Sequence, residues 1–293
     1  MVAGTDNKQT ILSNSSATPI VSCDWLVDHL DDPSVRIVEV GSVPQNNAYL
    51  QKHIPGAVWC FWKDWCWHDT DRDFVTPQTA ARRLGAHGIS EDATLVFYGD
   101  PVQYGPYAAW TYSMAGHPDV RILDGGRQKW MASGRKMTAE ITECAPVKYR
   151  FRESNFSMRI GRDDVRTILG KPGHILLDVR SPEEYKGERV MPPPNFDHGA
   201  ERTGRIPGAL HLHYQDILDE DDTYISREAL QTKFSELNLR PSQSDEVILY
   251  CRLSHRASLV WFAMRHILGF ENVKIYDGSW TEWGSIVGFP IEK

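Results

Sequence analysis

The chain has 293 residues, of which 41% are hydrophobic and 24% are charged, a composition typical of folded proteins. Because it is longer than one ordinary domain, two domains are expected. The formal net charge of -7 argues against a general nucleic-acid or anionic-membrane surface, and no apolar run approaches the roughly 20 residues of a membrane span.

The cysteines and the N-terminal residues indicate the kind of compartment in which the protein folds. The five cysteines are odd in number and form no CxxC pair, so neither a disulfide framework nor a zinc site is indicated. We therefore expect a reducing, cytoplasmic compartment, no metal and no cofactor. Residues 1–20 are polar and match no secretory signal, and they are predicted to be a flexible lead-in.

Hydrophobic periodicity and turn residues predict alternating helices and strands along the chain. In the first half, a helix over residues 23–30 precedes a short apolar strand and an Ile-Pro-Gly-Ala turn that enters a second strand. A helix over 77–87, a strand ending at Tyr98, another helix and a strand over 120–123 follow. The second half has the same order, with helices over 161–169 and 227–237, a strand ending at Tyr250 and a last strand over 273–276. This alternation indicates parallel sheets covered on both faces.

The two halves are related by an internal repeat. Ile206 follows Ile54 by 152 residues, and Tyr250 follows Tyr98 by the same distance. We predict a first domain at 21–136, a connector at 137–160 and a second domain at 161–293.

An insertion distinguishes the second half. Asp178 follows Glu39 by only 139 residues, so the second half carries 13 more residues (152 − 139) before its Ile-Pro-Gly-Ala turn. They lie in 186–202, which contains three consecutive prolines and is therefore predicted to be a loop.

A cysteine stands where a strand meets a helix in the second half. Cys251 follows an apolar strand, and the helical spacing after Arg256 ends at Gly269. Free backbone N–H groups and the positive end of the helix dipole favour a thiolate and an adjacent anion, and Arg252 adds positive charge. The matching segment of the first half, residues 99–105, contains no cysteine. The second half is therefore predicted to carry the reaction.

These motifs resemble the tandem-domain rhodanese family of sulfurtransferases over residues 20–293. The resemblance rests on both Ile-Pro-Gly-Ala turns, the Asp-Gly-Gly and Asp-Gly-Ser-Trp segments, and the loop from Cys251 to Arg256. It implies an α/β fold with two tandem rhodanese-like domains, each a parallel sheet with helices on both faces, of which only the second is active. The cysteine would take a sulfane sulfur from a small donor, hold it as a persulfide and pass it to a thiol or cyanide.

The loop residues suggest the donor and the roles of individual side chains. Family members with basic residues in this loop resemble thiosulfate sulfurtransferases, so Arg252 and Arg256 favour thiosulfate as the donor. The alternatives are 3-mercaptopyruvate as the donor, or a persulfide carrier that docks on a partner protein. Ser254 is expected to donate a hydrogen bond to the persulfide, although thiosulfate-type loops have glycine there. Leu253, Ser254 and His255 make the loop bulkier, which leaves other donors and acceptors open. The role of His255 also stays open.

Supporting residues are predicted around this loop. Glu183 and Glu184 stand where many tandem members have a substrate-binding arginine, so Arg202, with Arg205 beside it, is a candidate to replace that positive charge. The alternative for both arginines is a solvated surface position. Trp280 is a candidate for lining the pocket mouth, with core packing as its alternative. Asp178 and Arg180 are expected to support the site structurally.

Two other interpretations are less favoured. The Trp-rich cluster over residues 59–68 is expected to pack between the domains or to form an apolar wall near the site, and its Cys66 and His68 are too few ligands for a metal. Cysteine phosphatases also place a Cys-to-Arg loop between strand and helix, but their loop is one residue longer. The four residues between Cys251 and Arg256 make a tighter ring, suited to one sulfur atom.

Overall fold

The computed structural model describes residues 19–150, 152–192, 194–242 and 244–293. Most of the predicted lead-in, residues 1–18, and Pro193 of the predicted loop lie outside them. Among the described residues, no helix is long and apolar enough to cross a membrane.

Two five-stranded parallel sheets form the frame, and their strand orders match: β1-β5-β4-β2-β3 in the first and β6-β10-β9-β7-β8 in the second. The predicted repeat and parallel sheets are therefore confirmed. The first sheet comprises β1 (Ile20–Val21), β2 (Val35–Gly41), β3 (Ala57–Phe61), β4 (Thr94–Asp100) and β5 (Val120–Leu123). The second comprises β6 (Arg159–Ile160), β7 (His174–Asp178), β8 (Leu210–His211), β9 (Glu246–Tyr250) and β10 (Val273–Tyr276).

Helices connect the strands, and most of the long ones begin where the sequence predicts because their caps are local. Thr76 accepts a hydrogen bond from Thr79 N at the start of α4, and Ser226 does the same for Ala229 N at α9. The first half contains α1 (Cys23–Asp28), α2 (Asn47–Gln51), α3 (Trp62–Cys66), α4 (Pro77–Ala86), α5 (Tyr104–Met114) and α6 (Gly126–Ala132). The second contains α7 (Arg162–Ile168), α8 (Pro182–Tyr185), α9 (Arg227–Glu236), α10 (His255–Phe262), which continues as a π-helical turn over Ala263–Leu268, and α11 (Ser279–Trp283).

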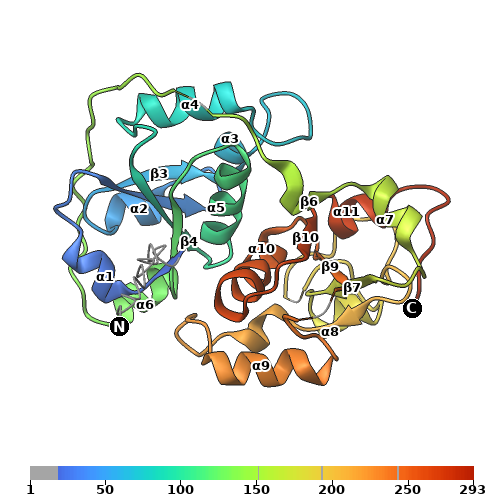
Figure 1. Cartoon of the computed structure of the whole chain (residues 1–293). Helices are drawn as coiled ribbons and strands as arrows, with labels where there is room; N and C mark the ends of the chain where they lie inside the picture. The colour runs from blue at the N-terminus through green and yellow to red at the C-terminus, as the bar shows by residue number, and fades with distance from the viewer. Residues whose placement is uncertain (1–18, 151, 193, 243) are drawn as a thin grey trace, which may run out of the picture.

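Helices α5 and α10 face one another between the two halves (Figure 1). They follow the corresponding strands β4 and β9, so the repeat places them on opposite sides of the boundary between the two halves, which is called the seam below. One hydrophobic cluster includes side chains of both helices and of both sheets. The start of α10, where Cys251 lies, is consequently next to the start of α5.

Candidate active site

Cys251 begins a loop that is anchored to the turn between β10 and α11. Its N–H donates to Ser279 Oγ at 3.2 Å, and its carbonyl accepts a hydrogen bond from Trp280 N at 2.9 Å. The cysteine is only 1% exposed. Both the N–H and the carbonyl group of Cys251 are therefore held in place by hydrogen bonds.

Ser254 supports the shape of the loop by a hydrogen bond to the segment after β10. Its φ of 71° lies in the left-handed region, which explains why related loops use glycine there. Its buried Oγ donates to the carbonyl of Asp277 at 2.8 Å. The expected hydrogen bond from Ser254 to a persulfide is thus replaced by one that ties the loop to the end of β10.

The loop leaves a set of backbone donors unused. The first bond of α10 runs from Ser258 N to Ser254 O. Within the described ranges, the N–H groups of residues 252–257 have no hydrogen-bond partner. These groups surround the start of an eight-residue helix, which is a suitable place for an anionic sulfur next to Cys251.

Arg256 is buried and paired with Glu184 on α8. Its Nη1 and Nη2 donate to Glu184 Oε2 and Oε1 at 2.6 and 2.9 Å. Burial is the largest single influence and opposes the charge of each group, but the partner's charge and hydrogen bonds together outweigh it, so the pKa of Arg256 is raised and that of Glu184 is lowered. The carboxylate that the sequence places near the site therefore balances one of the two loop arginines.

Arg252 is the loop arginine that keeps an unbalanced charge. Burial lowers its pKa and the charge of Arg256 lowers it further. Among the residues that the structure describes, its side chain has no hydrogen bond or ion pair. The predicted loop passes beside it, since a Cβ on Gly199 would lie 2.5 Å from Arg252 Nη1.

His255 is enclosed by aromatic rings of the first half. The ring centroids of Trp62, Tyr104 and Tyr107 lie 4.4, 4.6 and 4.3 Å from its imidazole. Burial, followed by the charges of Arg252 and Arg256, puts its pKa well below the ordinary value, so the ring is neutral near pH 7. His255 therefore joins the two halves.

Two residues near the loop were missed by the sequence-based assignment. Tyr104 lies within electrostatic reach of Cys251, Arg252 and Arg256, and Tyr214 has its ring 5.8 Å from the Arg256 guanidinium carbon. The repeat contained a signal for Tyr104, because a shift of 152 residues aligns it with Arg256. No pattern in the sequence points to Tyr214.

The comparison with known proteins decides the family. Residues 22–133 and 162–286 each match the family described as "Rhodanese-like domain". The chain belongs to the rhodanese family. This confirms the resemblance to that family that the sequence motifs indicate.

Relatives of similar length share about the whole chain. It is 40% identical over 278 residues to "Sulfur carrier protein TtuD" of Thermus thermophilus, covering 94% of this chain and 96% of the relative. It is 39% identical over 280 residues to a Haloferax volcanii protein named "Putative thiosulfate sulfurtransferase", with the same coverage. The chain is accordingly a rhodanese-family sulfurtransferase.

Solved structures of the same frame include an anaerobic ergothioneine biosynthesis enzyme from Chlorobium limicola in complex with trimethyl histidine. It is 25% identical, with a TM-score of 0.80 over 94% of this chain and 70% of that chain. A variant of EanB with a cysteine persulfide and ergothioneine matches with the same identity, TM-score and coverage.

Three residues that the sequence suggested for the pocket, Arg202, Arg205 and Trp280, take structural places instead. Arg202 donates to the carbonyls of Trp283, Gly284, Ile286 and Phe289, which caps the end of α11. Arg205 pairs with Glu292. Trp280 is fully buried, with its ring 4.6 Å from the Arg180 guanidinium carbon, so it lies in the core and not at a pocket mouth. The alternative of packing holds for the tryptophan.

Asp178 and Arg180, which are expected to support the site, form a buried ion pair. Both are fully buried, and Arg180 Nη2 donates to Asp178 Oδ2 at 2.6 Å and to Gly204 O at 2.7 Å. The pair links the end of β7 to the turn before β8. Glu184 lies on the short helix that follows, so this link helps to position it.

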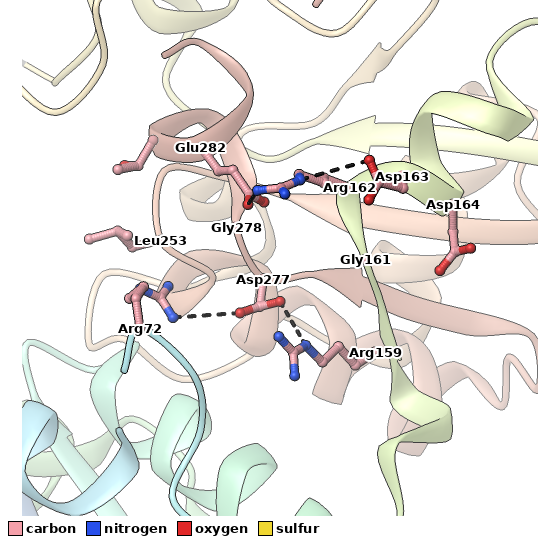
Figure 2. A pocket seen from close by; sticks show the side chains of 11 residues that line it. Arg72, Arg159, Gly161, Arg162, Asp163, Asp164, Leu253, Asp277, Gly278 and Glu282 are labelled. Carbon is pink, nitrogen blue, oxygen red and sulfur yellow. Dashed lines mark hydrogen bonds and ion pairs between the residues drawn. The ribbon is translucent and has the colours of Figure 1, made fainter. Parts of the chain in front are cut away.

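Leu253 lines a cavity of about 450 Å³, which Figure 2 shows. Asp277 lies at its centre between Arg159 Nε at 2.9 Å and Arg72 Nη1 at 3.6 Å. Arg72 belongs to the first half, and Arg159 also reaches Asp73 there at 2.9 Å. The ion pairs Arg72–Asp277 and Arg159–Asp73 therefore link the two halves.

The tryptophan-rich cluster packs in the first half and along the seam. Trp62 contacts His255, and Trp67 Nε1 donates to Tyr107 O–H at 2.9 Å. Cys60 and Cys66 are buried, and burial raises the pKa of the Cys66 thiol to about 12. In the part of the chain that the structure describes, no group of three or more His, Cys, Asp or Glu side chains could hold a metal ion.

Proposed function

We propose that Cys251 takes a sulfane sulfur from thiosulfate, holds it as a persulfide and passes it to a thiol or cyanide. The observation that carries this proposal is the run of N–H groups of residues 252–257 that follows the cysteine and has no hydrogen-bond partner among the described residues. Such donors stabilise the negative charge that the sulfur keeps in the free thiolate and in the persulfide.

The steps need only groups of this chain and its two substrates. The Cys251 thiolate attacks the outer sulfur of thiosulfate, an S–S bond forms to Cys251, and sulfite leaves with the electron pair of the broken bond. An acceptor thiolate or cyanide then attacks the same sulfur and restores the thiolate. Arg252, for which the described residues provide no carboxylate partner, would stabilise the anionic donor and the leaving sulfite.

Replacing the cysteine tests the proposal. Incubation with thiosulfate should add one sulfur atom to Cys251 by intact-protein and peptide mass spectrometry, and Cys251→Ser should abolish both this addition and turnover. Cys66→Ser, a buried thiol in the other half, is the matched control and should keep the parent rate. Persistent turnover in the Cys251 variant would overturn the proposal.

A persulfide carrier that delivers sulfur to a protein is the second candidate, favoured by the relative named as a sulfur carrier protein. It uses the same cysteine chemistry and differs in the acceptor. A protein that forms the Cys251 persulfide but releases no sulfur to cyanide or to small thiols would favour the carrier. 3-Mercaptopyruvate as donor is tested by measuring kcat/KM for it beside thiosulfate.

A further inference from the structure

The charges around Cys251 are fewer than its two neighbouring arginines suggest. Glu184 and Arg256 form a bidentate ion pair in which the carboxylate is fully buried. Arg252 is the remaining loop cation. With Cys251 as a thiolate, the two arginines and the two anions sum to zero. A thiosulfate ion brings two further negative charges to this site, whereas an organic hydropersulfide brings at most one on its sulfur atoms.

Glu184 is held in place independently of any donor. Its carboxylate Oε2 accepts a hydrogen bond from Ser181 N at 3.0 Å, and Ser181 Oγ accepts one from Glu184 N at 3.4 Å, which forms a capping box at α8. The charge is therefore a fixed part of the site and does not have to be recruited from solvent. In a buried site a fixed charge acts on a ligand more strongly than a solvated one does.

We propose that Glu184 is a specificity-determining residue that shifts the preference of this site from thiosulfate toward organic hydropersulfides, R–S–SH, as sulfur donors. This inference rests on the proposed persulfide chemistry of Cys251. The thiolate attacks the outer sulfur of the donor, the new S–S bond to Cys251 forms, and the S–S bond within the donor breaks. The electron pair leaves with R–S, which takes the proton of the donor, so the products are R–SH and the Cys251 persulfide anion.

The test compares two donors on the same protein, because the ratio of their kcat/KM values does not depend on the fraction of correctly folded enzyme. The probes are thiosulfate and the hydropersulfide of N-acetylcysteine methyl ester, whose R group is uncharged. Glu184→Gln keeps the hydrogen-bonding shape of the capping box and removes the charge. We expect it to shift the ratio toward thiosulfate by about tenfold, the scale of one charge acting over several ångströms in a protein site.

Glu183→Gln is the matched control. It makes the same charge change on the same helix, but within the described ranges Glu183 has no ion pair with either loop arginine. It should leave the donor ratio within about twofold, as surface charge changes usually have small effects.

Arg252→Gln tests the same inference with the opposite sign and does not disturb the buried pair. Removing this charge should lower kcat/KM for thiosulfate about tenfold more than for the hydropersulfide. An unchanged ratio in Glu184→Gln, or in Arg252→Gln if the first variant does not fold, overturns the role of Glu184. Absence of a Cys251 persulfide with both donors in the parent protein overturns the proposed function instead.

Discussion

The loops after Tyr98 and Tyr250 occupy the same place in the two sheets but differ in what they can hold. Both tyrosine hydroxyls accept a backbone hydrogen bond from the Ile-Pro-Gly-Ala turn, from Ile54 N at 3.2 Å and from Ile206 N at 3.1 Å. Beyond the tyrosine, the first loop closes on itself. A Cβ on Gly99 would lie 2.5 Å from Gly105 N and 2.6 Å from Pro101 O, so there is no room for a side chain.

The second loop is kept open by contacts that the first does not have. Ser279 and the backbone of Trp280 hold Cys251, and Ser254 reaches the end of β10. The first half instead contributes Tyr104 and other aromatic rings to the wall of the site. The comparison teaches that the repeat preserves strand ends, while a few loop contacts distinguish the half that we propose to react from the half that encloses it.

The buried acid and arginine pairs of the two halves support this view. Arg180 follows Asp178 by two residues, whereas Glu39 is paired with Arg127, 88 residues away, at 2.7 Å. A shift of 153 residues aligns Arg127 with Trp280, which packs on Arg180. Each half thus places one guanidinium behind its loop, from a different position in the sequence.

Placing a thiol in the first loop is the most disruptive way to test the comparison. Gly99→Cys should lower the free energy of unfolding by about 3 kcal/mol, because its Cβ meets backbone atoms that cannot move away cheaply. The measurement is the chemical denaturation midpoint, combined with mass spectrometry after thiosulfate treatment, which should detect no sulfur on residue 99.

The matched control for that change is Gln103→Cys, which adds a thiol to the same loop at a partly exposed position that already carries a side chain. Its stability should stay within about 0.5 kcal/mol of the parent. A stable Gly99→Cys protein that accumulates a persulfide on residue 99 would contradict the idea that the first loop has no functional space.

The seam between the halves should respond to acid through His255. Its folded pKa is depressed, so the unfolded chain takes up a proton below about pH 6.5 while the folded protein does not. The stability that neutral His255 contributes is present above that pH and is lost as the pH falls toward the folded pKa, by about 1.4 kcal/mol per pH unit.

His255→Phe should remove this part of the pH dependence, since phenylalanine can fill the same aromatic enclosure without titrating. Denaturant titrations of parent and variant at pH 7 and pH 5.5 measure the difference. Equal slopes in the two proteins would mean that His255 accepts its proton in the folded state, and that the first half does not isolate it from solvent.

Turn and cap residues explain why the bounds of several strands and helices could be predicted from the sequence. The last strands are observed at the predicted residues 120–123 and 273–276, and the helix predicted over 77–87 is observed as Pro77–Ala86. Turns and caps involve residues that are close in the chain, so their patterns are visible without a structure. The short helices α3, α8 and α11 were not predicted, because too few residues define a period.

Side-chain roles were harder to predict because they depend on distant partners. Glu184 and Arg256 are 72 residues apart, and the sequence alone suggested repulsion of the donor without showing which charge the carboxylate balances. Arg202 was assigned to the donor, but its guanidinium meets carbonyls more than 80 residues away. Burial and pairing of this kind arise only when the sheet brings the segments together.

The smallest effect is expected at the point where the two halves meet over the cysteine. Tyr104 lies within electrostatic reach of Cys251, so Tyr104→Phe, which removes the polar hydroxyl, should slow persulfide formation by about three- to tenfold. Rapid-mixing kinetics with thiosulfate measure this step.

Tyr107→Phe is the control, because that ring also packs on His255 but its hydroxyl accepts a hydrogen bond from Trp67 Nε1. It should cost about 1 kcal/mol of stability and leave the rate within about twofold. Equal rates in the Tyr104 variant and the parent would reduce the first half to packing alone, whereas a selective loss at Tyr104 would make it a direct contributor to the reaction.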